Sequence, residues 1–258
     1  MYPQIPLFGD YAVSSYSFFS TLGAVLFAVI CYREARRLNF SIDIYWKLFF
    51  FVAVFAMIGS KILYSVSFDR ARFFSDPIGT LGATGWMLYG ALAGGYVAVL
   101  FGRMFLKFPL FTALDGMSYG AIFGVGMGRI ACFMGGCCGG LPTDSFLGVT
   151  FHHGECAVHP TQLYEAGFAF LLFGVLYYIR RGSFFDGLQI SLMFIGYGTF
   201  RFLVEFIRAD SLRPGFQPFT PSQYISILIV LIATAIILFK RNPKATLIRL
   251  RKKAKNGD

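Results

Sequence analysis

The stretch from Leu48 to Ile58 reads LFFFVAVFAMI and contains no charged or hydrogen-bonding side chain. An uninterrupted apolar run favours a helix inside lipid, because a transmembrane β-strand alternates apolar and polar residues over about ten positions. With its flanks, the run is long enough to cross ~30 Å of hydrocarbon, which takes about 20 helical residues. The sequence therefore predicts a membrane-spanning helix over residues 44–66.

Six further stretches share this length and apolar character: about 13–32, 86–105, 111–134, 162–179, 187–207 and 221–239. Of the 258 residues, 56% are hydrophobic and 14% are charged, against the ~25% charged content of soluble globular proteins. This composition excludes a disordered chain, a collagen, a small disulfide-rich protein and an ordinary soluble enzyme. It predicts an all-α integral membrane protein with seven transmembrane helices, built as a single polytopic domain over residues 1–258.

The basic residues of the connecting loops are distributed unequally between the two sides of the predicted membrane domain. With the N-terminus outside, the cytoplasmic side carries fifteen Lys and Arg and the outer side carries four. Basic loops stay in the cytoplasm, so we expect an outward N-terminus, an outward loop at about 136–161 and a cytoplasmic C-terminus. The basic tail at about 240–258 is expected to bind anionic lipid headgroups. No recognition motif accompanies the net charge of +10, so nucleic acid is not an expected partner.

The segment GYGTFRFLVEFIRAD, residues 196–210, carries charged side chains into a predicted span. Tyr197, Arg201 and Glu205 recur every four residues and share one helix face, and Arg208 follows on that face. A charge at the centre of a span costs ~2.5–3.5 kcal/mol on insertion scales, so it normally faces a partner or a wet cavity. A structural Arg–Glu pair between helices is one interpretation. The full polar stripe favours a cavity that accepts an anion.

A further intramembrane arginine, Arg129, follows a row of glycines in the fourth predicted span. The glycines recur at every fourth residue from 116 to 128, a spacing that lets another helix pack closely. Gly90 and Gly94 in the preceding span form a candidate facing surface. We therefore expect close helix packing beside Arg129.

The sequence HPTQLYEA, residues 159–166, opens the fifth predicted span. A solvated helix cap explains His159 and Gln162, because polar side chains are common at the start of a helix. It does not explain Tyr164 and Glu165, which enter an apolar helix rich in Phe and Leu. This carboxylate is therefore a second candidate for a polar site within the membrane.

Together these blocks resemble the phosphatidylglycerol–prolipoprotein diacylglyceryl transferase family of the bacterial cytoplasmic membrane. HPTQLYE at 159–165 matches the family, and YGTFRFLVEFIR at 197–208 is close to its YGxFRFxVEFxR pattern. The start and end of its GRxGNFxNxExxG signature are also present, at Gly128, Arg129, Phe133 and Gly140. Seven spans and an outward N-terminus agree with this resemblance, which covers nearly the whole chain.

The resemblance implies a transferase that needs no cofactor. It would move the diacylglyceryl group of phosphatidylglycerol to the lipobox cysteine thiol of a preprolipoprotein, forming a thioether and releasing glycerol phosphate. The planar fork of arginine suits a phosphate, so Arg129 and Arg201 are assigned to the phosphate, with Glu205 orienting Arg201. The candidate catalytic residues are Arg129, Arg201, Glu205, Tyr197, His159 and Tyr89. The candidate substrate-binding residues are Tyr16, Gln162, Tyr164, Glu165, Arg208 and Gly140.

The chain departs from the family pattern at positions that matter for chemistry. Tyr89 stands where the family has a histidine, and Cys132 and Cys137 replace an asparagine and the glutamate of the signature. A tyrosine of pKa ~10 is a poorer base near neutral pH than a histidine of ~6.5. The group that deprotonates the thiol stays open among His159, Tyr89 and Glu165. A divergent paralogue with another acceptor, an anion transporter and an inactive scaffold are the alternatives.

The predicted outward loop concentrates sulfur and imidazole groups. Its donors are Cys137, Cys138, Cys156, His152, His153 and His159, and Cys132 lies shortly before it. They suffice for a tetrahedral metal site, but their spacing fits no regular zinc pattern. An oxidising outer compartment favours a disulfide from Cys137 or Cys138 to Cys156. Free buried thiols, a metal site and a catalytic thiol that carries the lipid are the other interpretations.

Overall fold

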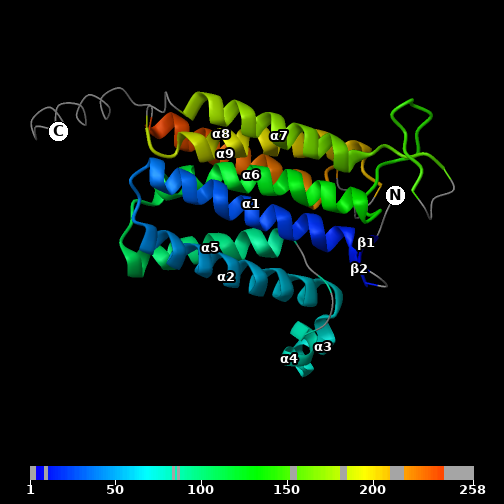
Figure 1. The fold of residues 1–258 in the computed structure, drawn as a ribbon, viewed down its shortest axis with the longest axis horizontal. Helices are drawn as coiled ribbons and strands as arrows, with labels where there is room; N and C mark the ends of the chain where they lie inside the picture. The colour runs from blue at the N-terminus through cyan, green and yellow to red at the C-terminus, as the bar shows by residue number, and fades with distance from the viewer. Residues whose placement is uncertain are drawn as a thin grey trace, which may run out of the picture. The chain divides into compact units, whose positions relative to one another are not determined.

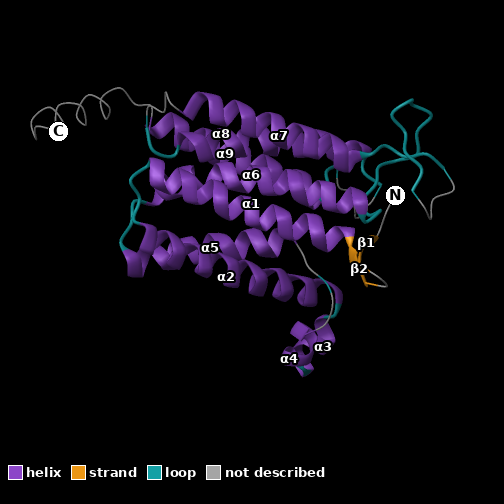
Figure 2. Cartoon of the chain, in the orientation of Figure 1, coloured by secondary structure: helices purple, strands orange, loops and turns teal. Residues whose placement is uncertain are grey.

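The computed structural model describes residues 4–8, 11–82, 85, 88–151, 156–180, 185–209 and 218–240. These residues are mostly helical (Figure 2), as predicted. The helices are α1 (Ser15–Arg37), α2 (Ile42–Phe68), α3 (Arg70–Ser75), α4 (Pro77–Gly82), α5 (Leu88–Leu106), α6 (Leu110–Met134), α7 (Thr161–Ile179), α8 (Leu188–Val204), the 3-10 turn η2 (Glu205–Ile207) and α9 (Pro221–Lys240). Before α1, the strands β1 (Gln4–Phe8) and β2 (Tyr11–Ser14) pair in an antiparallel hairpin.

Within the described residues, six helices are long and apolar enough to cross a membrane. They are α1, α2, α6, α7, α8 together with η2, and α9. Each coincides closely with a predicted stretch. The stretch at 86–105 corresponds to α5, but the apolar part described there, Ala93–Leu106, is shorter than a full crossing. The structure thus confirms a multi-pass helical membrane protein, while the seventh span and the sides on which the termini lie stay predictions.

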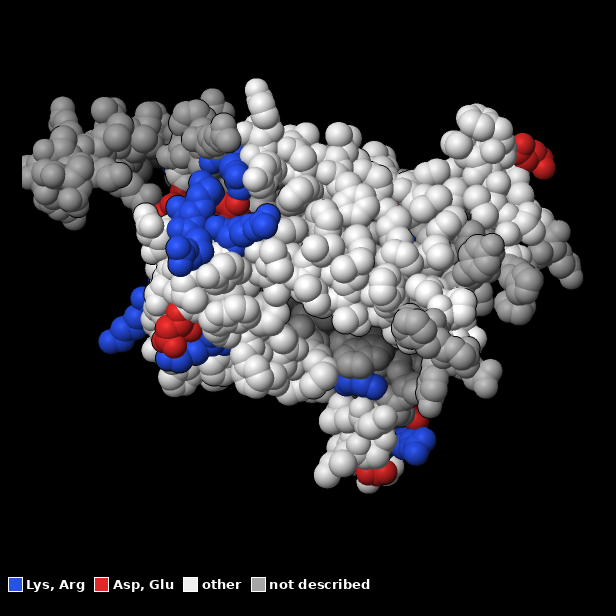
Figure 3. All heavy atoms as spheres, in the orientation of Figure 1, with Lys and Arg blue, Asp and Glu red and all other residues white. Residues whose placement is uncertain are grey.

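The outer surfaces of these helices are apolar. Phe50 on α2 is 69% exposed and Leu171 on α7 is 64% exposed. In lipid such side chains need no cover, and the helical backbone satisfies its own hydrogen bonds, as the bilayer interior requires. Figure 3 shows no Lys, Arg, Asp or Glu atoms on the visible surface over the middle of α7, whereas basic side chains gather near its end. This distribution is the one expected for a membrane-spanning helix.

The chain forms two compact units. One comprises residues 1–31 and 114–258, and α8 packs there against both α7 and α9 (Figure 1). Its core lies among α6, α7 and α8 and consists of Tyr119, Ile122, Ala169, Leu176, Ile190 and Met193. The other unit, residues 32–113, contains α2 packed along α5, with the short α3 and α4. The single polytopic domain over residues 1–258 stays a prediction.

The packing of α2 against α5 depends on glycines. A Cβ at Gly90 would collide with the backbone carbonyl of Gly59, and one at Gly94 would collide with the carbonyl of Phe55. Small residues allow two helix backbones this close approach. The expectation that Gly90 and Gly94 face the glycine row of α6 was therefore wrong, because they face α2. Within that row, Gly120 packs against α1.

Asp115 is a buried carboxylate that joins α6 to the start of α8. It is 8% exposed and accepts hydrogen bonds from the backbone N–H of Gly187 at 2.6 Å and of Ile190 at 2.9 Å. The first N–H groups of a helix have no partner within the helix. Asp115 supplies an acceptor from a different helix. Sequence analysis did not single it out, because an acid in an apolar span gives no sign of the helix that it caps.

We expect Asp115→Ala to lower the free energy of unfolding by about 1–3 kcal/mol, because it leaves two buried amide donors without an acceptor. Asp115→Asn keeps one acceptor oxygen and should fall between the wild type and Ala. The midpoints of thermal unfolding, measured on the three purified proteins in detergent, give the order of their stabilities. Equal midpoints for all three proteins would show that this cap contributes nothing to stability.

Candidate active site

Glu165 is the centre of an ion-pair cluster. Its side chain, near the start of α7, is 0% exposed. One carboxylate oxygen, Oε2, lies 3.0 Å from Nε of Arg129 on α6 and 4.0 Å from Nε of Arg201 on α8. The other, Oε1, accepts a hydrogen bond from Arg208 at 3.0 Å, and the hydroxyl of Tyr197 donates to Oε2 at 3.1 Å. A single buried carboxylate thus brings together guanidinium groups from three separate places in the chain, namely α6, α8 and the residue after η2.

Glu205 is the second carboxylate of the cluster. Its Oε2 lies 2.5 Å from a terminal nitrogen of Arg201 and 3.8 Å from Nε of Arg208. The hydroxyl of Thr220 donates to Oε1 at 2.8 Å, while Arg201 also donates to the Ser222 hydroxyl at 3.5 Å. The predicted contact between Arg201 and Glu205 is confirmed. Each carboxylate therefore contacts at least two of the arginines.

The end of α8 differs from the predicted continuous helix. The α-helix stops at Val204, residues 205–207 form the 3-10 turn η2, and Arg208 has an extended backbone with φ −83° and ψ 138°. A 3-10 turn winds more tightly than an α-helix, so it changes the direction of the following side chain. Arg208 and Tyr197 nevertheless both reach Glu165, from opposite ends of this segment.

The start of α9 holds Thr220 in place. The backbone N–H of Thr220 donates to the side-chain oxygen of Gln223 at 2.9 Å, and the N–H of Gln223 donates to the Thr220 hydroxyl at 3.3 Å. This reciprocal pair is a capping box. Sequence reasoning missed Thr220, although the motif TPSQ at 220–223, directly before an apolar run, carries the capping signal. The cap fixes the hydroxyl that binds Glu205.

The described ion-pair cluster carries a net charge of +1. Three guanidinium groups face two carboxylates, and the arginine side chains are only 12%, 13% and 6% exposed at Arg129, Arg201 and Arg208. Charges in a low-dielectric interior are strongly penalised unless they are paired. Two charges of each sign cancel, which leaves one positive charge for a singly charged anion. The arrangement therefore suits a phosphodiester.

The loop between α6 and α7 is hydrogen-bonded to the end of η2. The backbone N–H of Leu141 donates to the carbonyl of Ile207 at 2.9 Å, and that of Gly140 donates to the carbonyl of His159 at 2.8 Å. A Cβ at Gly140 would meet both of these carbonyls at under 3 Å. The glycine is required for this close approach. Gly140, expected to bind substrate, acts in the structure through its backbone.

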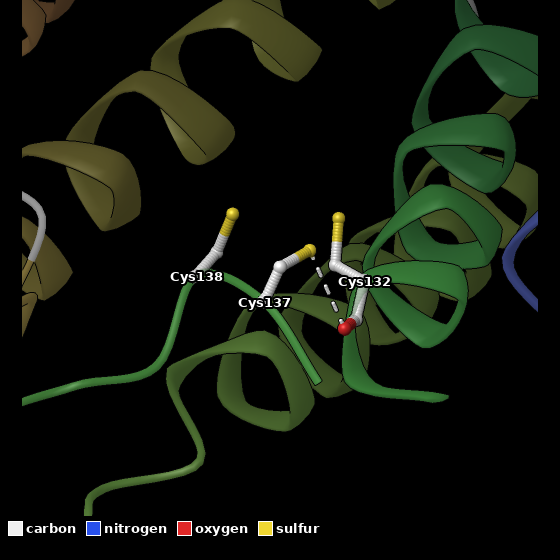
Figure 4. Close-up of side chains that lie close together, drawn as sticks. All are labelled: Cys132, Cys137 and Cys138. Carbon is white, nitrogen blue, oxygen red and sulfur yellow. Dashed lines mark hydrogen bonds between the residues drawn. The ribbon is translucent and has the colours of Figure 1, made fainter. Parts of the chain in front are cut away.

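Three cysteines converge where α6 passes into this loop (Figure 4). The Sγ atoms of Cys132, Cys137 and Cys138 all lie within 4.8 Å of one another. The side-chain amide of Gln162 donates to the carbonyl of Cys137 at 2.6 Å, and the hydroxyl of Thr161 donates to the carbonyl of Cys138 at 3.1 Å. The first turn of α7 therefore supports the loop that carries two of the thiols. Gln162, expected to bind substrate, is part of this support.

The cysteine arrangement differs from the predicted one. All five cysteines lie in the described part of the chain and all are free, so the expected disulfide to Cys156 is not formed. Cys156 is exposed, and the three sulfurs that meet are those of Cys132, Cys137 and Cys138. Hydrogen bonds from the Cys132 and Cys137 thiols, and then the charges of nearby arginines, hold the pKa of Cys138 well below its usual range. His152 and His153 lie outside the described residues.

The remaining predicted site residues lie at the edges of these clusters, or their side chains lie outside the described part of the structure. Nδ1 of His159 is 3.3 Å from the hydroxyl of Tyr164. Tyr16 on α1 lies beside Gly135, at the end of α6, where an added Cβ would meet it at 3.5 Å. Tyr89 belongs to α5, in the other unit, and its side chain lies outside the described residues.

Residues 3–239 match the model of the family described as prolipoprotein diacylglyceryl transferase. A phosphatidylglycerol–prolipoprotein diacylglyceryl transferase of Clostridium tetani is 30% identical over 228 residues, which are 85% of this chain and 90% of the relative. One from a Wolbachia of Drosophila simulans is 30% identical over 252 residues, 94% of this chain and 96% of the relative. The family match includes both the ion-pair cluster and the three cysteines.

Proposed function

The chain belongs to the prolipoprotein diacylglyceryl transferase family, and on that premise we propose that its ion-pair cluster binds the phosphate of phosphatidylglycerol. The diacylglyceryl group then passes to the lipobox cysteine thiol of a preprolipoprotein. The thiol sulfur forms a bond to the glycerol carbon, the bond from that carbon to the phosphate oxygen breaks, and glycerol phosphate leaves. The observation that carries the proposal is the convergence of three arginines and two glutamates with a net charge of +1.

The charge of the phosphate changes during this reaction. A phosphodiester carries one negative charge, and the departing glycerol phosphate acquires a second as the bond breaks. Arginine N–H groups that are already oriented stabilise such a developing anion without reorganisation. The contact from Arg129 to Glu165 uses Nε, and the terminal nitrogens of Arg129 can donate to a phosphate oxygen in addition. We assign Arg129 and Arg201 to the phosphate, with Glu205 as the positioning residue of Arg201.

The acceptor thiol needs a base or an electropositive site, since its ordinary pKa is ~8.5. Glu165 is a poor candidate base, because its two oxygens already accept hydrogen bonds and ion pairs from Arg129, Arg208 and Tyr197. It serves instead as a positioning residue for the arginines. His159 is the better candidate, since its contact with Tyr164 involves Nδ1 and leaves Nε2 for an incoming thiol. A different acceptor is the second candidate function, favoured by the cysteines at signature positions.

We propose the bacterial cytoplasmic membrane as the location, with the N-terminus outside and the basic tail inside. In support, the Lys240 ammonium at the end of α9 donates to the carbonyl of Asp186, just before α8, so basic groups gather at one end of these helices. Arg180, after α7, contacts the Tyr177 ring at the end of the same helix. Anionic headgroups would bind the tail, most of which lies outside the described residues.

The direct test is a transfer assay. Membranes that contain the full chain are incubated with labelled phosphatidylglycerol and a lipobox peptide, and the products are identified by mass spectrometry. We expect a thioether-linked diacylglyceryl peptide and free glycerol phosphate. A wild-type protein that forms no lipidated peptide would contradict the proposed function. Anion flux into proteoliposomes without any covalent product would instead support a transporter.

We expect Arg201→Lys to lower the transfer rate about 10–100-fold, because Lys keeps the charge but loses the two-point fork, a loss of roughly 1.4–2.7 kcal/mol. Arg180→Lys is the matched control, since Arg180 stacks on Tyr177 away from the cluster. The same transfer assay measures both variants. An unchanged rate for Arg201→Lys would show that the site needs only a point charge.

A further inference from the structure

The three-cysteine cluster has no part in the phosphate chemistry described above. We propose that Cys132, Cys137 and Cys138 bind one thiophilic cation of the Zn²⁺ class, and that the open fourth position of this cation takes the acceptor thiol. The metal site stands on the geometry of the three cysteines alone. The role of the cation in catalysis rests on the proposed transferase function.

The sulfur positions are close to those of a zinc site. A Zn–S bond of ~2.3 Å and tetrahedral angles place two ligand sulfurs about 3.8 Å apart, and here the three sulfurs lie within 4.8 Å of one another. Figure 4 shows the Cys137 sulfur between those of Cys132 and Cys138, all on one side of the loop. Small side-chain rotations would bring them to a common cation. Thiolate ligands select Zn²⁺ or Cu⁺ over Mg²⁺ and Ca²⁺.

The backbone around the thiols is held in place. Gly136 and Cys138 both have positive φ, 72° and 65°, and a non-glycine residue in this region is strained unless its surroundings fix it. The surroundings do so here, because the buried side chains of Thr161 and Gln162 hydrogen-bond the carbonyls of the two loop cysteines. A ligand set is effective when supporting residues orient it in this way.

Positive charge lies beside the cysteine cluster. The guanidinium groups of Arg208 and Arg129 are close enough for their charges to act on Cys138. Cys132 lies three residues after Arg129 on α6, so the two side chains share a helix face. Metal binding requires deprotonated cysteines. Arg129, which is proposed to bind phosphate, thus also places positive charge beside the proposed ligands.

A cation with three protein ligands and an open position suits the proposed reaction. Coordination deprotonates a thiol outright. A strong base is then not needed, although this chain has Tyr89 where the family has a histidine. The released proton passes to water or to His159. The coordinated sulfur then forms the bond to the glycerol carbon, and the electron pair of the broken C–O bond leaves on glycerol phosphate. The oxidation state of the cation does not change.

The metal site is tested without reference to activity. The full chain, purified in detergent under reducing, oxygen-free conditions, is titrated with Zn²⁺ and with Cd²⁺, and bound metal and thiolate-to-metal absorption are measured. We expect one cation per chain, lost when Cys132, Cys137 and Cys138 are all replaced by Ser. Cys156→Ser is the matched control and should bind as the wild type does. No stoichiometric binding, or equal binding by the triple variant, would overturn the site.

The catalytic role has its own test. A chelator should reduce lipidation of the peptide at least about tenfold, and Zn²⁺ but not Mg²⁺ should restore it, with phosphatidylglycerol binding unchanged throughout. Lipidation that survives metal removal would overturn the catalytic role while the site stands. A protein that binds the cation but never lipidates any peptide would contradict the proposed function, not the metal site. Diacylglyceryl groups found on the cluster cysteines themselves would show that these thiols act as carriers, and would overturn the role assigned to them.

Discussion

Glu165→Gln is expected to reduce lipid transfer by about 10²- to 10⁴-fold. The carboxylate is fully buried and lies at 3.0 Å from both Arg129 and Arg208. Its removal changes the net charge of the described cluster from +1 to +2. Removing one partner of a buried ion pair costs about 3–5 kcal/mol, because the remaining charge is left without compensation, and this energy corresponds to the expected loss in rate.

Tyr197→Phe is the matched control for this prediction. It deletes the hydrogen bond from the Tyr197 hydroxyl to Oε2 of Glu165 and leaves the net charge of the cluster unchanged. We therefore expect the transfer rate to fall only about tenfold. The transfer assay gives both rates, and thermal unfolding in detergent separates misfolding from a direct effect on the site. If Glu165→Gln were folded and retained more than a tenth of the wild-type rate, the carboxylate would not be what organises the arginines.

The membrane spans could be predicted from the sequence because lipid imposes a simple rule. A stretch such as residues 44–66 must be apolar over its whole length to cross the bilayer, so composition alone indicates the helix. The pairing of Arg201 with Glu205 was predictable for a similar reason, since residues four apart lie on one helix face. Both inferences rest on local periodicity, and the structure confirms both.

Features that depend on tertiary contacts were not predictable. Arg208 follows the 3-10 turn η2 with an extended backbone and reaches Glu165 from there, and no residue pattern marks that change of backbone. The disulfide to Cys156 was expected from the redox compartment, whereas all five cysteines are free and the sulfurs of Cys132, Cys137 and Cys138 meet. The fold of the loop between α6 and α7 decides which thiols meet. The β1–β2 hairpin was missed because two short strands carry little periodic signal.

Arg129→Gln is expected to lower the transfer rate about 10²- to 10³-fold. The substitution removes one of two arginines assigned to the phosphate and reduces the net charge of the described cluster from +1 to 0. Loss of one preorganised donor to a developing anion costs about 2.7–4 kcal/mol. Because the leaving group gains its second negative charge only as the C–O bond breaks, the arginine stabilises the transition state more than the bound lipid. The variant should therefore lose kcat to a greater extent than it raises the KM for phosphatidylglycerol.

The exposed Arg103 near the end of α5 provides the charge-matched control, and Arg103→Gln should transfer lipid at the wild-type rate. Combining Arg129→Gln with Glu165→Gln returns the net charge to +1, so the double variant should lose much less activity than the product of the two single losses. Residues that share one ion-pair network are coupled in this way. Losses that simply multiply, or an effect of Arg129→Gln on KM alone, would mean that Arg129 and Glu165 act separately and that the guanidinium does not stabilise the leaving phosphate.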